Sequence, residues 1–96
     1  MARVLFTPEA QDEARDARLW LRVRQPTTVQ GFRDRLARAR AELRRFPEAG
    51  PEYLVGTRRL ELSPYPYYLV YRVEGDVVAV IAVPHTSQGE AYWRGR

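Results

Sequence analysis

Residues 29–46 read VQGFRDRLARARAELRRF, and this stretch has the clearest periodicity in the chain. Its apolar positions alternate steps of three and four residues: Val29, Phe32, Leu36, Ala39, Leu43 and Phe46. Most of the positions between them are arginine or acidic, so the pattern predicts an amphipathic helix with one face against a core. Thr27 and Gln30 predict a capping box at its start, and Pro47 with the Gly50-Pro51 pair predicts its end.

The residues before this helix predict a strand and another helix. Residues 2–6 are β-branched and apolar, which favours a short strand. Thr7-Pro8-Glu9 is typical of a helix start, with Thr7 as the cap. That helix should run from Pro8 to about Arg24, because the Gln25-Pro26 pair disfavours its continuation. Only a short linker separates the two helices, so we expect an antiparallel helical hairpin.

The chain after residue 52 is strand-like. We expect strands at 53–62, with a possible break at Gly56, at 67–73 and at 77–83. A tight turn at 74–76 joins the strands at 67–73 and 77–83. The strand at 77–83 has apolar residues on both of its faces, which is typical of a central strand. The order β-α-α-β-β-β predicts one α+β domain over residues 1–96, with the helical hairpin packed on a mainly antiparallel sheet. We expect the other sheet face to be partly open, as a place for a partner.

The composition excludes several kinds of site. The 96 residues include no cysteine and one histidine, so disulfides, cysteine zinc sites and multi-histidine metal sites are excluded. We expect no metal and no cofactor. The net charge is +4, and all 16 basic residues are arginine. Either a coding bias explains this, or arginine is used for its bidentate contacts with carboxylate and phosphate. The charge favours a polyanionic target or an acidic partner. Because no signal peptide or membrane-spanning run is present, we expect a soluble cytoplasmic protein with no membrane partner.

Four features outside the core are candidates for function. Arg58 and Arg59 point to opposite faces of a strand, and Arg59 could either pair with Glu61 or bind phosphate or carboxylate. The tyrosines at 65, 67, 68 and 71 favour sheet core and rim over a stacking platform. His85 is either a loop residue with ordinary hydrogen bonds or a group that transfers a proton. The final residues, YWRGR at 92–96, either fold back on the domain or serve a partner.

Three segments resemble ParE-family toxins, members of the ParE/RelE toxin superfamily. They are RRLEL at 58–62, YPYYLVYRV at 65–73, and the ending that runs from VPH at 83–85 to YWRGR at 92–96. The segments FTPEA at 6–10 and FP at 46–47 with Gly50 are also similar. The resemblance covers nearly the whole chain and implies a RelE/ParE-like fold. It also implies the toxin component of a type II toxin–antitoxin system, with an antitoxin that is acidic and has a DNA-binding N-terminus.

The resemblance leaves two targets open. ParE-like toxins inhibit DNA gyrase without being hydrolases, whereas RelE-like toxins cut mRNA on the ribosome. Arg59, His85 and Tyr92 are the catalytic candidates for a nuclease. However, Tyr68, Glu61 and Thr86-Ser87-Gln88 stand where RelE-like nucleases carry basic residues, which favours gyrase inhibition. A weakened toxin that retains only antitoxin binding is a third reading. The candidate target-binding residues are Arg58, Arg59, Arg72, His85, Tyr92, Trp93, Arg94 and Arg96.

Overall fold

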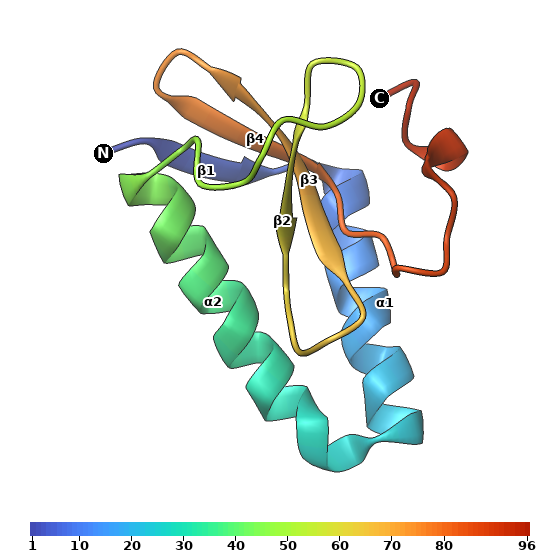
Figure 1. Cartoon of the computed structure of the whole chain (residues 1–96). Helices are drawn as coiled ribbons and strands as arrows, with labels where there is room; N and C mark the ends of the chain where they lie inside the picture. The colour runs from blue at the N-terminus through green and yellow to red at the C-terminus, as the bar shows by residue number, and fades with distance from the viewer.

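The computed structural model describes residues 1–96, and its elements follow the predicted order (Figure 1). The strands are β1 (Arg3–Phe6), β2 (Arg58–Glu61), β3 (Tyr68–Glu74) and β4 (Val77–Ala82). The helices are α1 (Pro8–Arg24) and α2 (Val29–Arg45), with the short 3-10 turns η1 (Pro26–Thr28) and η2 (Glu90–Tyr92). The predicted α+β class and the order β-α-α-β-β-β are confirmed.

The four strands form one sheet in the order β1-β4-β3-β2. β1 runs parallel to β4, with Arg3 opposite Val77 and Phe6 opposite Val80. The other two pairings are antiparallel, so the sheet is mainly antiparallel as predicted. The first strand of the chain therefore lies beside the last one.

The start of α1 follows the predicted chemistry, and the start of α2 does not. The Thr7 side chain accepts a hydrogen bond from the Ala10 amide at 3.1 Å, which caps α1. The capping box predicted from Thr27 and Gln30 is wrong. Residues 26–28 form η1 instead, so no extended cap residue precedes α2, and the Gln30 amide donates to Asp34 at 3.0 Å.

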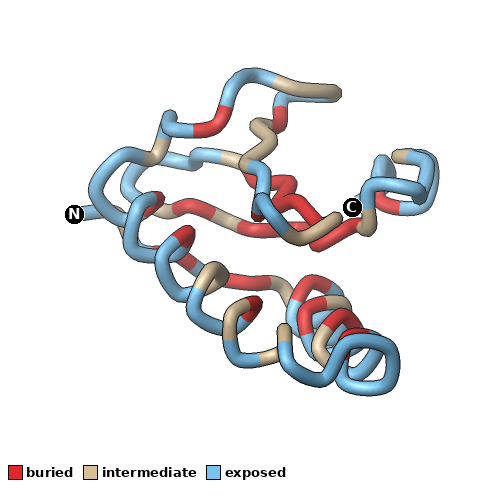
Figure 2. Tube along the Cα trace, turned by 60° about the horizontal axis from the view of Figure 1, so that its bottom comes forward, coloured by how far each residue is buried: buried red, intermediate tan, exposed pale blue.

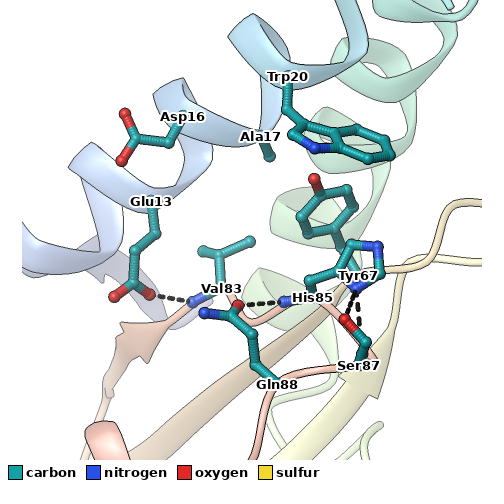
Figure 3. A pocket seen from close by; sticks show the side chains of 9 residues that line it. All are labelled: Glu13, Asp16, Ala17, Trp20, Tyr67, Val83, His85, Ser87 and Gln88. Atoms are coloured by element: carbon teal, nitrogen blue, oxygen red, sulfur yellow. Dashed lines mark hydrogen bonds between the residues drawn. The ribbon is translucent and has the colours of Figure 1, made fainter. Parts of the chain in front are cut away.

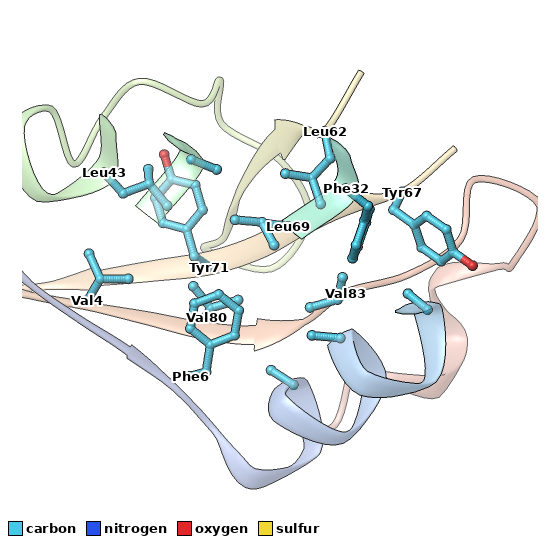
Figure 4. Packing of buried hydrophobic residues seen from close by; sticks show 14 of the residues in the cluster. Val4, Phe6, Phe32, Leu43, Leu62, Tyr67, Leu69, Tyr71, Val80 and Val83 are labelled. Atoms are coloured by element: carbon cyan, nitrogen blue, oxygen red, sulfur yellow. The ribbon is translucent and has the colours of Figure 1, made fainter. Parts of the chain in front are cut away.

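The helical hairpin covers one face of the sheet, and the main core lies between them (Figure 4). Phe32 of α2 is fully buried, with its ring centroid 5.5 Å from Tyr67 and 5.6 Å from Tyr65. One stripe of α1, made mostly of alanine, is buried in the same core: Ala10, Ala14, Ala17 and Leu21. Because alanine has a short side chain, the stripe lets α1 approach the sheet closely.

Residues 53–57 form a tight loop, so the strand predicted over 53–62 is wrong in its first half. Val55 and Gly56 both have positive φ angles, of 54° and 70°. The Tyr53 amide donates to the carbonyl of Thr57 at 2.8 Å, which closes the loop. The predicted break at Gly56 is confirmed, and it is a chain reversal that glycine accommodates without a Cβ penalty.

The face of the sheet that points away from the helices, here called the far face, is covered in part. A second cluster of buried residues covers one region of it: Tyr68, Val70, Ile81, Ala82 and Trp93. Leu5 of β1 alternates with the core residues Val4 and Phe6 and is 47% exposed, so the face is partly open, as expected. Trp93 comes from the C-terminal tail, residues 85–96, and is fully buried against this face. In Figure 2, buried residues therefore follow the central strands and also appear in the tail. The sequence showed two possible places for the tail aromatics, and Trp93 takes the intramolecular one.

The helices give no membrane-spanning segment. Neither α1 nor α2 combines the length and the apolar character that crossing a bilayer requires.

Candidate functional site

Arg59 lies on the far face and is already paired. Its guanidinium forms an ion pair with Glu61, donates to the Tyr53 hydroxyl at 3.2 Å, and stacks 3.5 Å from the centre of the Tyr68 ring. The hydrogen bond to Glu61 is the main cause that raises the pKa of Arg59. The reading in which Arg59 pairs with Glu61 is therefore confirmed. Its charge is largely balanced within the chain.

Arg58 belongs to the opposite face and secures the loop after α2. Its guanidinium donates to the carbonyl of Gly50 at 2.8 Å and pairs with the Glu48 carboxylate at 3.2 Å. Gly50 in turn donates its amide to the Tyr71 hydroxyl at 2.9 Å. Arg58 therefore holds the residues 48–50 against β2 and does not lie with Arg59 on one surface.

The tail is attached to the domain through Glu13 of α1. One carboxylate oxygen of Glu13 accepts the Val83 amide at 2.8 Å, and the other pairs with Arg96 at 2.8 Å. The Arg96 guanidinium also donates to the carbonyl of Ile81 at 3.0 Å, and Arg72 donates to the Arg96 carbonyl at 3.2 Å. These contacts join α1, the end of β4 and the last residue in one network. Charged hydrogen bonds of this kind are worth roughly 1.5–3 kcal/mol each.

Glu13 is a functional candidate that was not predicted from the sequence. It follows Ala10 by three positions and precedes Ala17 by four, which places it beside the buried stripe of α1. That spacing was a usable signal for a carboxylate at the edge of the core. Its partners lie far along the chain, at Val83 and Arg96, and no local pattern identifies them.

Tyr92 also contacts Glu13, and it holds its proton firmly. Its hydroxyl donates to the Glu13 carboxylate at 3.4 Å, and 40% of the residue remains exposed. Burial of the phenol, followed by the charge of Glu13, raises the pKa of Tyr92 far above its ordinary range. A tyrosine in this state is not a base at neutral pH. The arrangement orients Tyr92 without activating it.

His85 is directed toward α1 (Figure 3). Its ring lies 5.8 Å from the Trp20 ring and 5.1 Å from the Tyr67 ring. Its Nδ1 accepts the Ser87 amide at 3.0 Å, so in the neutral imidazole the proton is on Nε2. No hydrogen bond, ion pair or ring contact joins any two of the nuclease candidates Arg59, His85 and Tyr92.

Arg94 and Arg72 are the cations of the tail region without an acidic partner. Arg94 is exposed and makes no hydrogen bond or ion pair within the chain. Arg72 is half-buried, and its one bond goes to a backbone carbonyl. These two side chains retain an unbalanced positive charge at the surface. By contrast, no three His, Cys, Asp or Glu side chains gather closely enough to hold a metal ion.

A basic groove lies between the two helices. Its cavity of about 480 Å³ is lined by three apolar residues of α2 and by four arginines: Arg18, Arg33, Arg40 and Arg44. The arginines come from both helices, so the hairpin gathers charge that the sequence spreads over residues 18–44. The periodicity of residues 29–46 predicts the core-facing stripe of α2, but it does not indicate that the arginines of α2 meet Arg18 of α1 in one groove.

Tyr68 gives the far face a measurable response to alkali. Burial, with the neighbouring Tyr53 hydroxyl, raises the pKa of Tyr68 to about 12. In the unfolded chain a tyrosine loses its proton near pH 10. The stabilisation from the protonated Tyr68 is therefore complete below about pH 10 and is lost as the pH rises toward about 12.

We expect the free energy of unfolding to fall more steeply in the wild type than in Tyr68→Phe between pH 8 and about 11, by about 1–2 kcal/mol. Urea unfolding at several pH values measures this difference. Equal pH slopes for the two proteins would show that Tyr68 is not buried in solution.

Two comparisons relate the chain to known proteins. The family model described as "ParE toxin of type II toxin-antitoxin system, parDE" matches residues 4–89. Among solved structures, the chain is similar to one from the "Chromosomal ParDE TA system from P. aeruginosa", with a TM-score of 0.75 and 18% sequence identity. That likeness covers 88% of this chain and 96% of the other, and it shows a shared fold. No curated protein matches the chain.

Proposed function

This chain belongs to the ParE toxin family of type II toxin–antitoxin systems, and we propose that it inhibits DNA gyrase by direct binding and is neutralised by a cognate antitoxin. The pairing of the arginines with acidic residues favours a toxin that binds its target over one that cleaves a phosphate bond. Arg59 pairs with Glu61, Arg58 with Glu48, and Arg96 with Glu13. A ribosome-dependent mRNA endonuclease would need fixed, uncompensated cations where charge develops on the phosphate.

The proposed contact with gyrase centres on the exposed part of the tail. Arg94 and Arg72 supply charge without an acidic partner, and Tyr92 supplies an exposed, oriented ring. Aromatic and arginine side chains are the commonest strong contributors at protein interfaces. In this proposal Arg59, Trp93 and Arg96 shape the surface from within, and Arg58, which holds the loop at 48–50, is not part of it. His85 lies at its edge.

The proposed antitoxin is acidic and binds the groove between α1 and α2. The arginines of the groove supply positive charge, and Leu36, Ala37 and Ala41 of the groove supply apolar contacts. An amphipathic acidic segment would match both parts of this surface. The surface of this chain that binds gyrase and the groove that binds the antitoxin would then be separate.

The proposed target can be tested with purified gyrase. We expect this protein at micromolar concentration to inhibit the supercoiling of a relaxed plasmid by gyrase. Arg94→Glu should raise the concentration that gives half inhibition about tenfold, which corresponds to about 1.4 kcal/mol of binding free energy. The matched control is Arg38→Glu, the same charge change at an exposed residue of α2, which should leave inhibition nearly unchanged.

Normal supercoiling at micromolar chain would overturn the gyrase proposal. Primer extension on translated mRNA then separates the remaining readings. New ends that disappear with Tyr92→Phe would assign a ribosome-dependent endonuclease. If no new ends form and growth continues when the gene is induced alone, the chain is a weakened toxin that retains only antitoxin binding.

A further inference from the structure

A cleft of about 360 Å³ lies between α1 and the chain that follows β4 (Figure 3). One wall is a single face of α1, where Glu13, Asp16 and Trp20 follow at steps of three and four residues. Tyr67 and His85 form the opposite wall. None of the sixteen arginines of this chain lines the cleft. Its charged residues are therefore both acidic, within a protein whose net charge is +4.

Asp16 is the acidic residue of the cleft that is less engaged within the chain. Its side chain is 69% exposed, and its nearest cation is Arg15, at 4.0 Å along the same helix. Glu13, by contrast, is occupied by Arg96 and by the Val83 amide. A carboxylate at the mouth of a cleft with low-polarity walls attracts a cation more strongly than one on an open surface.

The aromatic walls suit a flat cation. Trp20 is 39% exposed, and the Arg24 guanidinium already lies 4.7 Å from the centre of its ring. An arginine of this chain therefore already stacks on part of the Trp20 ring, and a second guanidinium would use the part of the ring that lines the cleft. The Tyr67 and His85 rings close the other side of the same space.

The Tyr67 hydroxyl offers the cleft an acceptor that has no partner within the chain. Tyr67 is only 6% exposed, and its hydroxyl points into the cleft toward Ala17 and Trp20 without a hydrogen bond inside the chain. The one buried polar side-chain atom without a partner is the Trp93 indole nitrogen, so the Tyr67 oxygen is open to the cleft and to donors that enter it. A ligand with several N–H donors would pair with this oxygen and with Asp16 together.

We propose that the cleft binds one arginine side chain from a protein partner. The guanidinium stacks on Trp20, donates to the Asp16 carboxylate and donates to the Tyr67 oxygen. Arginine fits better than lysine, because its planar fork supplies several donors while its face lies on an aromatic ring. This site goes beyond the proposed gyrase contact and holds whichever protein the toxin acts on.

The probe is the peptide acetyl-Gly-Arg-Gly-amide, added to the isotope-labelled full chain and followed by NMR. We expect saturable shifts of the Trp20 indole N–H, with a dissociation constant on the order of 1 mM, as for a single side chain. The buried Trp93 indole serves as the internal control and should not shift. The same peptide with citrulline, which keeps the shape and removes the charge, should bind at least about fivefold more weakly.

Three variants assign the contacts. Asp16→Asn should weaken binding about five- to tenfold, and Tyr67→Phe about two- to fivefold, without loss of folding. Asp12→Asn removes the same charge one turn away, outside the cleft, and should leave binding unchanged. The proposal is overturned if Trp20 does not respond at millimolar peptide, if citrulline binds as well as arginine, or if acetyl-Gly-Glu-Gly-amide binds more tightly.

Discussion

Replacing Trp93 by alanine should lower the free energy of unfolding by about 3–5 kcal/mol, the usual cost of removing a large buried aromatic side chain. Trp93 is fully buried, and its ring centroid lies 5.9 Å from that of Tyr53. It also packs on Tyr68 and Val70 of β3 and on Ile81 of β4. The loss would be a large fraction of the roughly 5–15 kcal/mol that keeps a domain folded.

Two matched variants test the cause of this loss by urea unfolding. Trp93→Phe should cost about 1–2 kcal/mol, because the indole N–H of Trp93 has no hydrogen-bond partner in the chain and only volume is lost. Trp20→Ala removes the same side chain from a site that is 39% exposed, and should cost less than about 1.5 kcal/mol. If Trp93→Ala and Trp20→Ala were equally mild, the tail would not be packed on the far face in solution.

Gly50→Ala should cost about 1–3 kcal/mol, the range for forcing a side chain into a packed site. A Cβ at this position would lie 2.5 Å from the carbonyl oxygen of Arg59 and 3.0 Å from the Tyr71 hydroxyl. The first contact is with backbone, so β2 or the residues around 50 must move. Movement would weaken the hydrogen bond from the Gly50 amide to Tyr71 and the bond from Arg58 to the Gly50 carbonyl.

Gly89→Ala is the control for Gly50→Ala. No atom lies within 4 Å of a Cβ built at Gly89, whose φ of −74° suits any residue. We expect its free energy of unfolding to stay within about 0.5 kcal/mol of the wild-type value, or to rise slightly because alanine lowers the entropy of the unfolded chain. Equal midpoints for the two variants would contradict the close packing of residue 50 against β2.

The helices were predictable because their signals are local. The α2 stripe repeats within one stretch, and the Thr7 cap is three residues from the amide that it binds. The pairing of Arg59 with Glu61 was likewise open to prediction, since two residues apart on a strand share a face. Each of these features depends on neighbours in the sequence.

The features that the sequence did not predict depend on distant partners or on turn conformation. Tyr53, Val55 and Thr57 have high strand propensity, yet Val55 and Gly56 adopt positive φ angles and reverse the chain. The cover of the far face needs Trp93 to meet β3 and β4, and no periodicity announces a single tail aromatic. The site around Glu13 needs Val83 and Arg96, which only the folded chain brings to α1.

The parallel pairing of β1 with β4 also determines when this sheet can form during synthesis. Arg3 to Phe6 are among the first residues made, but their partners are Val77 to Val80. Until those residues have left the ribosome, β1 has no strand to bind, and the helical hairpin covers an incomplete sheet. Contacts so distant in sequence also slow folding. A toxin of this architecture therefore acquires its native surface only after nearly all of residues 1–96 have been synthesised, which leaves an interval for a waiting antitoxin to bind it.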